Sequence, residues 1–595
     1  MKDITIKTVY GIDYYYYEET ELIDGKPTVV RKKRLGAVED LAAKIKVPAM
    51  LSRKEELFSE EFEFGAVALM YDLAKKLNLV DIIDRHATNV RTGPSVGSYM
   101  VAVAIYLAVA PSSSGDPQEW FEKTCLPLMT GIGGFRFSLQ NFWAKASKID
   151  RDTLRATLLG RVPVDSIWSI DEDILSRVKD IYDIDVSNVI CCPTNSFAYV
   201  GGRDDGKLTA PGGHMPQEKK PHVETFYIEV STDYCIPITH NGDPGATNYA
   251  EELALHVDSR QRYCKPIVGK TNTVLLVLDR ENFCGDDDIR VLVSGNALKN
   301  IPAAEKDIYH YLGLLRKSQA ESLWAVPKGE YVPLIGDRFT GLSAYRMEVE
   351  FFGQRLTGLI FNDPGLKERQ IEEIKINVEK AKAKLQDLEE ALTRRAKGGD
   401  AEGTEPTVES VGECVENILK DEYVKDILKC DIFEKNKNVL LKYSTSEQSL
   451  ELISRDILGK TALYTNRHDY SNEEIVAAYL TARHVGQEFA RMADTKRLKP
   501  RQKFRWTDKR IKLHIFTCVL AYRLRALLIK DLATQGIDIG IDQLISEMSE
   551  VKAVETVYGG KERPEVVATL TGGSELAQRL VELYRLREKY LGHTL

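Results

Sequence analysis

The sequence lacks the features of a membrane-anchored, disulfide-linked or zinc-binding protein. Its longest apolar run, Val101 to Ala110, is far shorter than the roughly 20 residues of a membrane-spanning helix, so we expect a buried helix there. The opening residues MKDITIKTVY contain no apolar segment of a secretory signal. The nine cysteines are scattered, with no CxxC pair and no Cys/His spacing of zinc type, which favours reduced thiols. We therefore expect a cytoplasmic protein without membrane contact.

The sequence also lacks an excess of basic residues. Its formal net charge is −8 and its pI about 5.9, whereas nucleic-acid-binding proteins usually carry basic charge that neutralises phosphates. Any contact with DNA must come from a local patch, and the densest patch has six cations interleaved with Phe504 and Trp506. These cations are Lys496, Arg497, Lys499, Arg501, Lys503 and Arg505. The composition suits phosphate contact with stacking on aromatic rings, although a solvated basic loop would have the same sequence.

A chain of 595 residues exceeds what one hydrophobic core usually holds, so we expect several structural units. In order, these are a small β-rich unit (1–55), a helical region suited to DNA binding (56–180), the first part of an α/β core (181–335), an insertion (336–445), and the second part of the core with C-terminal helices (446–595). The first unit contains a hairpin turned at Asp24-Gly25, and one of its strands carries the basic run 31–34.

Strand patterns define the expected core. Residues 222–230 alternate with period two, residues 234–239 follow after a turn, and the apolar strand Thr273 to Leu278 ends at Asp279. With an earlier strand at 189–192 and a helix at 248–257, this order is typical of a ribonuclease-H-like core, although other α/β domains share it.

The clearest periodic signal lies in the insertion. Apolar residues alternate at spacings of three and four, as in a coiled-coil seam. They are Ile371, Ile374, Val378, Ala381, Leu385, Leu388 and Leu392. A polar loop at 397–403 separates them from a second apolar helix at 408–418, which predicts an antiparallel coiled-coil hairpin. The same seam could instead mediate a homo-oligomer.

Three stretches resemble motifs of a known family. Val189-Ile-Cys-Cys-Pro-Thr-Asn-Ser-Phe resembles a first-strand motif, hydrophobic-Tyr-Asp-x-Thr-Asn-Phe, and Leu276-Val-Leu-Asp-Arg-Glu-Asn resembles a second motif, Val-Phe-Asp-Lys/Arg-Gly-Asn. Tyr464-Thr-Asn, with Tyr479 and Phe489, resembles the run into a third motif, Tyr-x2-Arg-x3-Glu-x6-Lys. In this order they resemble the DDE transposases of prokaryotic insertion sequences, and the resemblance extends over nearly the whole chain.

The resemblance implies a fold and a reaction. The fold would be an α/β ribonuclease-H-like mixed sheet core, interrupted by a β plus helical-hairpin insertion and preceded by a β hairpin and an all-helical region. The reaction would be DNA strand cleavage and transfer, in which three carboxylates hold two Mg²⁺ ions roughly 3.5–4 Å apart.

Matching the motifs residue by residue shows that most of the catalytic carboxylates are missing. The first Asp falls on Cys192, whose soft thiol is a poor ligand for Mg²⁺. The second survives as Asp279, which would be a vestigial metal ligand. Counting from Tyr479, the Glu of the third motif falls on Gly486. Glu488 does not replace it, because two residues rotate a helix by about 200°.

These losses predict a catalytically inactive, transposase-derived protein that is retained for DNA binding or assembly, with no cofactor. Three alternatives remain. The chain could be an active DDE transposase that uses Mg²⁺ at a rearranged site. It could have a protein-interaction or structural role without DNA. It could perform a new reaction at Cys192, although no histidine base occurs in the adjoining motifs.

Overall fold

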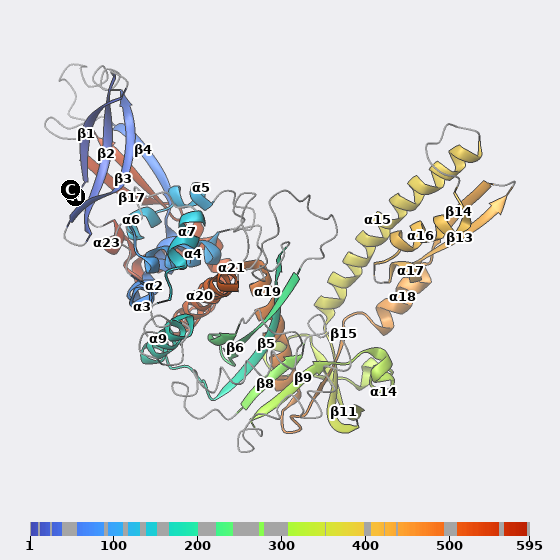
Figure 1. Ribbon diagram of the computed structural model, residues 1–595. Coiled ribbons are helices and arrows are strands. Elements are labelled where there is room, and N and C mark those ends of the chain that lie inside the picture. Colours follow the sequence, from blue (N-terminus) through green and yellow to red (C-terminus); the bar gives the residue numbers. More distant parts are fainter. Residues whose placement is uncertain are drawn as a thin grey trace, which may run out of the picture. The chain divides into compact units, whose positions relative to one another are not determined.

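Three antiparallel strands begin the chain: β1 (Lys2–Val9), β2 (Ile12–Ile23) and β3 (Lys26–Ala37), in the order β1-β2-β3 (Figure 1). Ile23 pairs with Lys26 in the hairpin that the sequence predicts around residues 24 and 25. The buried carboxylate of Glu18 accepts a hydrogen bond from Lys7 at 2.5 Å and lies 3.5 Å from Lys32. The positive charge of Lys32, on β3, is therefore partly neutralised by a carboxylate of the same sheet.

The computed structural model describes residues 2–9, 12–23, 26–37, 56–88, 93–110, 117–130, 139–150, 166–199, 222–241, 273–278, 308–351, 353–397, 406–421, 423–435, 438–492, 508–558 and 565–591. The chain divides into two compact units. The first unit comprises residues 1–311 and 478–595, and the second comprises residues 312–477.

Helices form much of the first unit. They include α2 (Gly65–Lys76), α3 (Leu79–His86), α4 (Val96–Val109), α9 (Ser166–Ile181) and α20 (Asp508–Thr534). The helix α4 contains the apolar run noted in the sequence and is buried on nearly all sides, which its uniformly apolar surface requires. Shorter helices α5 (Pro117–Glu122), α6 (Leu126–Thr130) and α7 (Leu139–Ala146) accompany it. In the described residues no helix has both the length and the apolar character required to cross a bilayer.

A mixed sheet lies in the same unit. Its strands are β5 (Asn188–Tyr199), β6 (His222–Ser231), β7 (Pro237–Asn241) and β8 (Thr273–Leu278), in the order β8-β5-β6-β7. The strands β5, β6 and β7 are antiparallel neighbours, and β8 lies parallel to β5. This arrangement is compatible with a ribonuclease-H-like core. The helix predicted at 248–257 lies outside the described residues.

The first unit contains another sheet, which the sequence did not predict. The strand β4 (Glu56–Glu63) pairs with β16 (Lys552–Tyr558), which also pairs with β17 (Glu565–Thr571). The expectation of helices alone at 56–180 and after 465 is therefore wrong at these strands. The paired strands β4 and β16 are far apart in the sequence, so no local sequence pattern predicts their pairing. Helices α21 (Ile541–Ser549), α22 (Glu575–Leu583) and α23 (Leu586–Tyr590) lie in the segment where the sequence predicts C-terminal helices.

Antiparallel strands also form the base of the second unit. They are β10 (Val332–Pro333), β11 (Ser343–Phe351), β12 (Gln354–Asn362), β15 (Lys460–Thr465) and the end of β9 (Tyr309–Leu314), in the order β10-β11-β12-β15-β9. The boundaries predicted from sequence at 335/336 and 445/446 both fall inside this unit.

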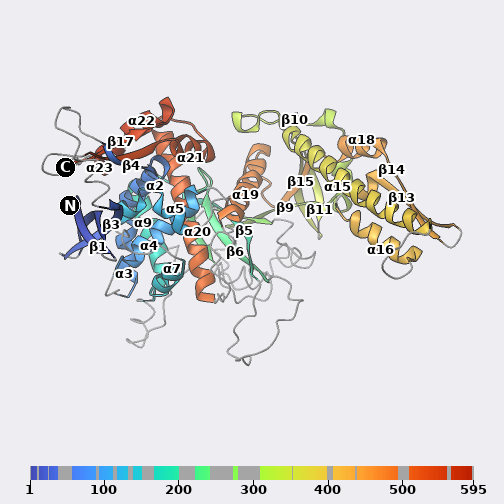
Figure 2. The same cartoon turned by 90° about the horizontal axis from the view of Figure 1, so that it is seen from above.

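The long helix α15 (Pro364–Ala396) carries the heptad seam, and its partners are more varied than one returning helix. Beside it lie α16 (Val408–Ile418), α17 (Val424–Ile427), the hairpin of β13 (Leu428–Lys435) and β14 (Asn438–Thr445), and α18 (Glu447–Asp456) (Figure 1; Figure 2 shows the same elements except α17 labelled from above). The seam residues are buried in one core with side chains from these elements. The second helix is short, so much of the seam packs on the β13–β14 hairpin, within the same chain.

Candidate functional site

Cys192 marks the first position at which the resemblance expects a catalytic carboxylate. It lies within β5, is 1% exposed, and pairs with Ile228 of β6, which in turn pairs with His240 of β7. Directly paired residues of antiparallel strands point to the same face of a sheet, so Cys192, Ile228 and His240 share one face. The helix α20 contacts β7, and Phe516 of α20 stacks on the His240 ring at 6.1 Å between centroids. The face that carries Cys192 is thus closed by packed side chains.

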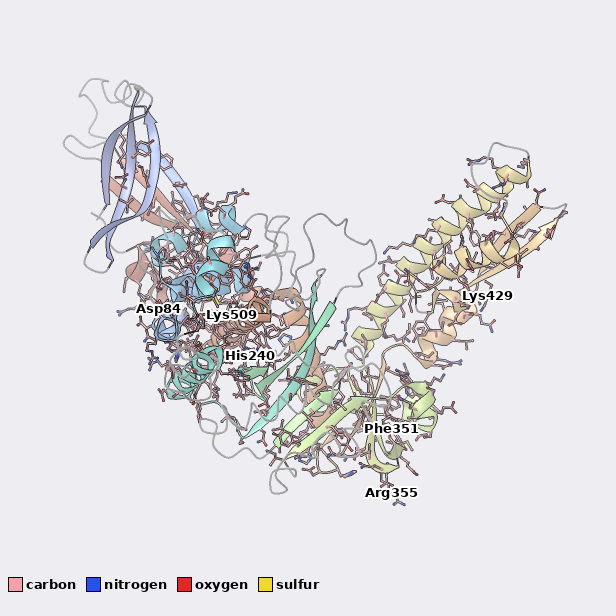
Figure 3. The ribbon with its side chains drawn as sticks, in the orientation of Figure 1. Asp84, His240, Phe351, Arg355, Lys429 and Lys509 are labelled. Carbon is pink, nitrogen blue, oxygen red and sulfur yellow. The ribbon has the colours of Figure 1, made fainter. Side chains whose placement is uncertain are left out.

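Three buried polar side chains meet beside this face. His240 Nδ1 lies 2.7 Å from one carboxylate oxygen of Asp171 on α9, and Arg523 Nη1 of α20 donates to the other at 2.8 Å (Figure 3 labels His240). Arg523 Nε also donates to the carbonyl of Pro237 at 3.1 Å. All three side chains are buried, with exposed fractions of 4% for Asp171, 5% for His240 and 1% for Arg523. Asp171, His240 and Arg523, which we call the buried triad, connect α9 and α20 to the strand β7.

The electrostatics of the triad favour an ionised carboxylate. Burial alone raises the pKa of Asp171, but the charges of Arg523 and His240 and their hydrogen bonds outweigh it and lower the pKa to about 2. Asp171 is therefore ionised at neutral pH and compensated by Arg523. Because both of its oxygens are engaged inside the protein, the triad is suited to holding elements together rather than to binding a metal.

Tyr522 lies close to Cys192. Its ring packs edge-on against Phe489 of α19 (Asn472–Met492) at 5.6 Å between centroids. Burial raises the pKa of Tyr522 well above its usual range, and the nearby Cys235, Cys192 and Glu488 raise it further. The hydroxyl is buried and makes no hydrogen bond with the described residues. A neutral phenol, rather than a charged or metal-binding group, thus lies near Cys192.

The third position at which the resemblance expects a carboxylate, Gly486, lies on α19 and has open space beside it among the described residues. A Cβ atom built there would meet no heavy atom within 4 Å. Glu488, two residues on, is only 3% exposed and is already engaged: its carboxylate accepts from Arg491 at 2.7 Å and lies 2.9 Å from Arg525. Arg525 also contacts Asp542 at 2.7 Å. Since both oxygens of Glu488 have cationic partners, this carboxylate does not act as a substitute metal ligand.

The other predicted site residues lie beyond the described part of the chain. Asp279 directly follows Leu278, the last residue of β8, but lies outside the described residues. The same is true of the six cations between 496 and 505. Within the described residues, no group of three or more His, Cys, Asp and Glu side chains is arranged to hold a metal ion. The structure thus places Cys192 and Gly486 but leaves Asp279 and the basic patch as predictions.

The buried triad and the ion pairs of Arg525 were not found from the sequence, although a signal exists. Asp171 stands among the apolar residues of α9 that face the core, and the two arginines stand in the largely apolar helix α20. A charged residue within a buried stripe requires a partner. The sequence alone does not identify that partner, because the three triad residues come from separate elements.

Comparisons with known proteins give little further information. No protein-family profile matches this chain, and no curated protein matches it in sequence. Among solved structures, it is similar to a cryo-EM structure of a piggyBac transposase synaptic complex with hairpin DNA. The similarity covers 81% of this chain and 79% of that chain, with 9% sequence identity and a TM-score of 0.34. At this distance a likeness carries no argument about function, which must come from the residues themselves.

Proposed function

We propose that this chain is a transposase-derived DNA-binding protein in which the catalytic centre for strand transfer has been lost. The observation that supports this most directly is the burial of Cys192, at the position expected for the first carboxylate, beneath packed side chains. A DDE reaction needs hard oxygen ligands open to metal and substrate, and a buried thiol provides neither.

The surroundings of the third position support the same proposal. Gly486 has no side chain, and the nearest carboxylate, Glu488, is compensated by Arg491 and Arg525. Of the three expected carboxylates only Asp279 remains, and one carboxylate does not hold two metal ions. The DNA-binding part of the proposal rests on the basic, aromatic-containing run from Lys496 to Trp506 in an otherwise acidic chain.

The test combines a catalytic and a binding measurement. The purified chain is incubated with DNA that carries the terminal inverted repeats of the insertion sequence from which it would derive, in Mg²⁺ and in Mn²⁺. Nicking and strand transfer are followed on gels. We expect no metal-dependent product, but retention of the DNA that weakens steeply as salt increases.

Two results would contradict the proposal. Cleavage that Asp279→Ala abolishes would mean that other carboxylates have taken over the site. Absence of any retention on DNA at low salt would remove the binding function and leave a protein-interaction role.

A further inference from the structure

Four lysines of the second unit lie on segments that contact one another and that carry none of the expected catalytic positions. Lys317 is in a 3-10 turn (Lys317–Gln319), Lys328 is in another (Lys328–Glu330), Lys367 is near the beginning of α15, and Lys460 begins β15. We call these four side chains the lysine cluster. In the described part of the second unit, none of the four ammonium groups forms an ion pair with a carboxylate.

The backbone fixes two members of the lysine cluster side by side. Gly459, with φ of 77°, accepts a hydrogen bond from the Asp363 amide at 2.7 Å and donates one to the Gln370 side chain at 2.8 Å. A Cβ atom at Gly459 would lie 2.8 Å from the Cβ atom of Lys367, so only glycine permits this approach. The beginning of α15 and the beginning of β15 are thereby held in contact, which brings the backbone of Lys460 close to Lys367.

Lys460 connects this contact to a third element. Its Nζ donates to the carbonyl of Trp324, at the end of α14 (Glu321–Trp324), at 3.3 Å and lies 5.9 Å from the centre of the Tyr331 ring (Figure 1 shows α14 and β15). Lys328 lies between these two aromatic residues in the sequence. Lys460 is thereby placed beside the segment that carries Lys328.

The charges of the lysine cluster act on one another. Burial lowers the pKa of Lys328, and Lys367 and Lys460 lower it further. Burial also lowers the pKa of Lys460, and Lys317 adds to that effect. Asp456 opposes both shifts, but Arg455 binds this carboxylate at 2.8 and 3.0 Å. Asp456 therefore compensates only part of the positive charge of the lysine cluster, and an anion placed among the ammonium groups would reduce their remaining repulsion.

We propose that the lysine cluster binds a phosphoryl group, with Lys317, Lys328, Lys367 and Lys460 supplying the positive charge. Ammonium groups are point-charge ligands for phosphate oxygens, and no described carboxylate competes for them at ion-pair distance. The phosphoryl group could belong to a nucleic-acid backbone or to a small phosphorylated molecule. The proposal does not depend on DNA binding through residues 496–505.

The experiment uses the full chain and inorganic pyrophosphate as the probe, with isothermal titration calorimetry at low salt. The cluster variant is Lys317→Gln with Lys328→Gln, because these exposed side chains make no hydrogen bond and their removal should leave the fold intact. The control is Lys384→Gln with Lys429→Gln, which removes the same charge from exposed positions on α15 and β13 (Figure 3 labels Lys429). We expect the affinity of the cluster variant to fall about tenfold or more, and that of the control to stay within about twofold of wild type.

A second titration identifies the source of the phosphoryl group. Duplex DNA is added as a competitor to the pyrophosphate complex of the wild-type chain. Displacement of pyrophosphate would assign the lysine cluster to a nucleic-acid backbone, and its persistence would assign it to a small phosphorylated molecule. The proposal is overturned if the wild-type chain binds neither probe, or if the cluster variant and the matched control bind both probes equally.

Discussion

At the scale of single residues, the proposal that a catalytic centre has been lost rests on two positions, Cys192 and Gly486. Both can be tested by restoring carboxylates with Cys192→Asp and Gly486→Glu in one chain. Gly486 has room for a side chain, whereas an aspartate at Cys192 would be buried and would require a counter-charge. With Asp279 as the third ligand, Mn²⁺ would supply that charge.

We therefore expect millimolar Mn²⁺ to raise the thermal unfolding temperature of this double variant but not that of wild type, because a ligand that binds only the folded state stabilises it. The double variant with Asp279→Ala added is the control and should lose the response. If Mn²⁺ stabilises none of these chains, the three positions do not converge, and the alignment with the transposase motifs is wrong.

The buried triad gives a second prediction at this scale. Asp171→Asn removes the charge that compensates Arg523 and should destabilise the first unit by about 3–5 kcal/mol at pH 7. The exposed Asp180, on the same helix, provides the control Asp180→Asn, which should change stability by no more than about 0.5 kcal/mol. Urea unfolding at pH 7 measures both, and equal stability of the two variants would show that Arg523 has another counter-charge.

The pH dependence of the same variant follows from the pKa of Asp171, which is lowered to about 2 in the folded chain. An unfolded aspartate has a pKa of about 3.9, so the ionised form stabilises the fold fully above about pH 4, and this contribution is lost as the pH falls toward 2. The difference in unfolding free energy between wild type and Asp171→Asn should shrink over that window. A difference that stays constant from pH 5 to pH 2.5 would contradict the assignment.

At the scale of elements, the sequence predicted those whose pattern is local. The apolar run became α4, the alternating and apolar segments became β6 and β8, and the heptad seam became the buried face of α15. It did not predict β4 and β16, whose pairing joins distant parts of the chain. The candidate site divides in the same way: Cys192 and Gly486 follow from motif spacing, whereas Asp171, His240 and Arg523 meet only in the folded chain.

The seam of α15 also gives a prediction at this scale. Leu385 is fully buried against elements of its own chain, so Leu385→Ala should destabilise the second unit by about 2–5 kcal/mol without changing the oligomeric state. Ile376, on the same helix but 46% exposed, provides the control Ile376→Ala, which should have little effect. Urea unfolding and sedimentation test the two claims. A change in sedimentation for Leu385→Ala would instead make the seam an interface between chains.

At the scale of the whole molecule, the net charge of −8 means that DNA binding must depend on where the cations lie. If the run from Lys496 to Arg505 contacts phosphates, each contact contributes about 0.9 to the slope of log affinity against log salt. Replacing its six cations by glutamine should therefore reduce that slope by up to about 5 and weaken binding to all DNA sequences alike.

The control for this prediction removes six positive charges elsewhere in the chain. The exposed lysines Lys375, Lys380, Lys384, Lys420, Lys425 and Lys429 serve this purpose. Fluorescence anisotropy with a labelled duplex, repeated from about 50 to 200 mM salt, gives the slope for each chain. A control slope that falls as much as that of the 496–505 variant would mean that total charge governs retention on DNA. An unchanged control beside a flattened variant would place the DNA contact in that one segment, and an acidic protein would then bind DNA through a patch that its overall charge conceals.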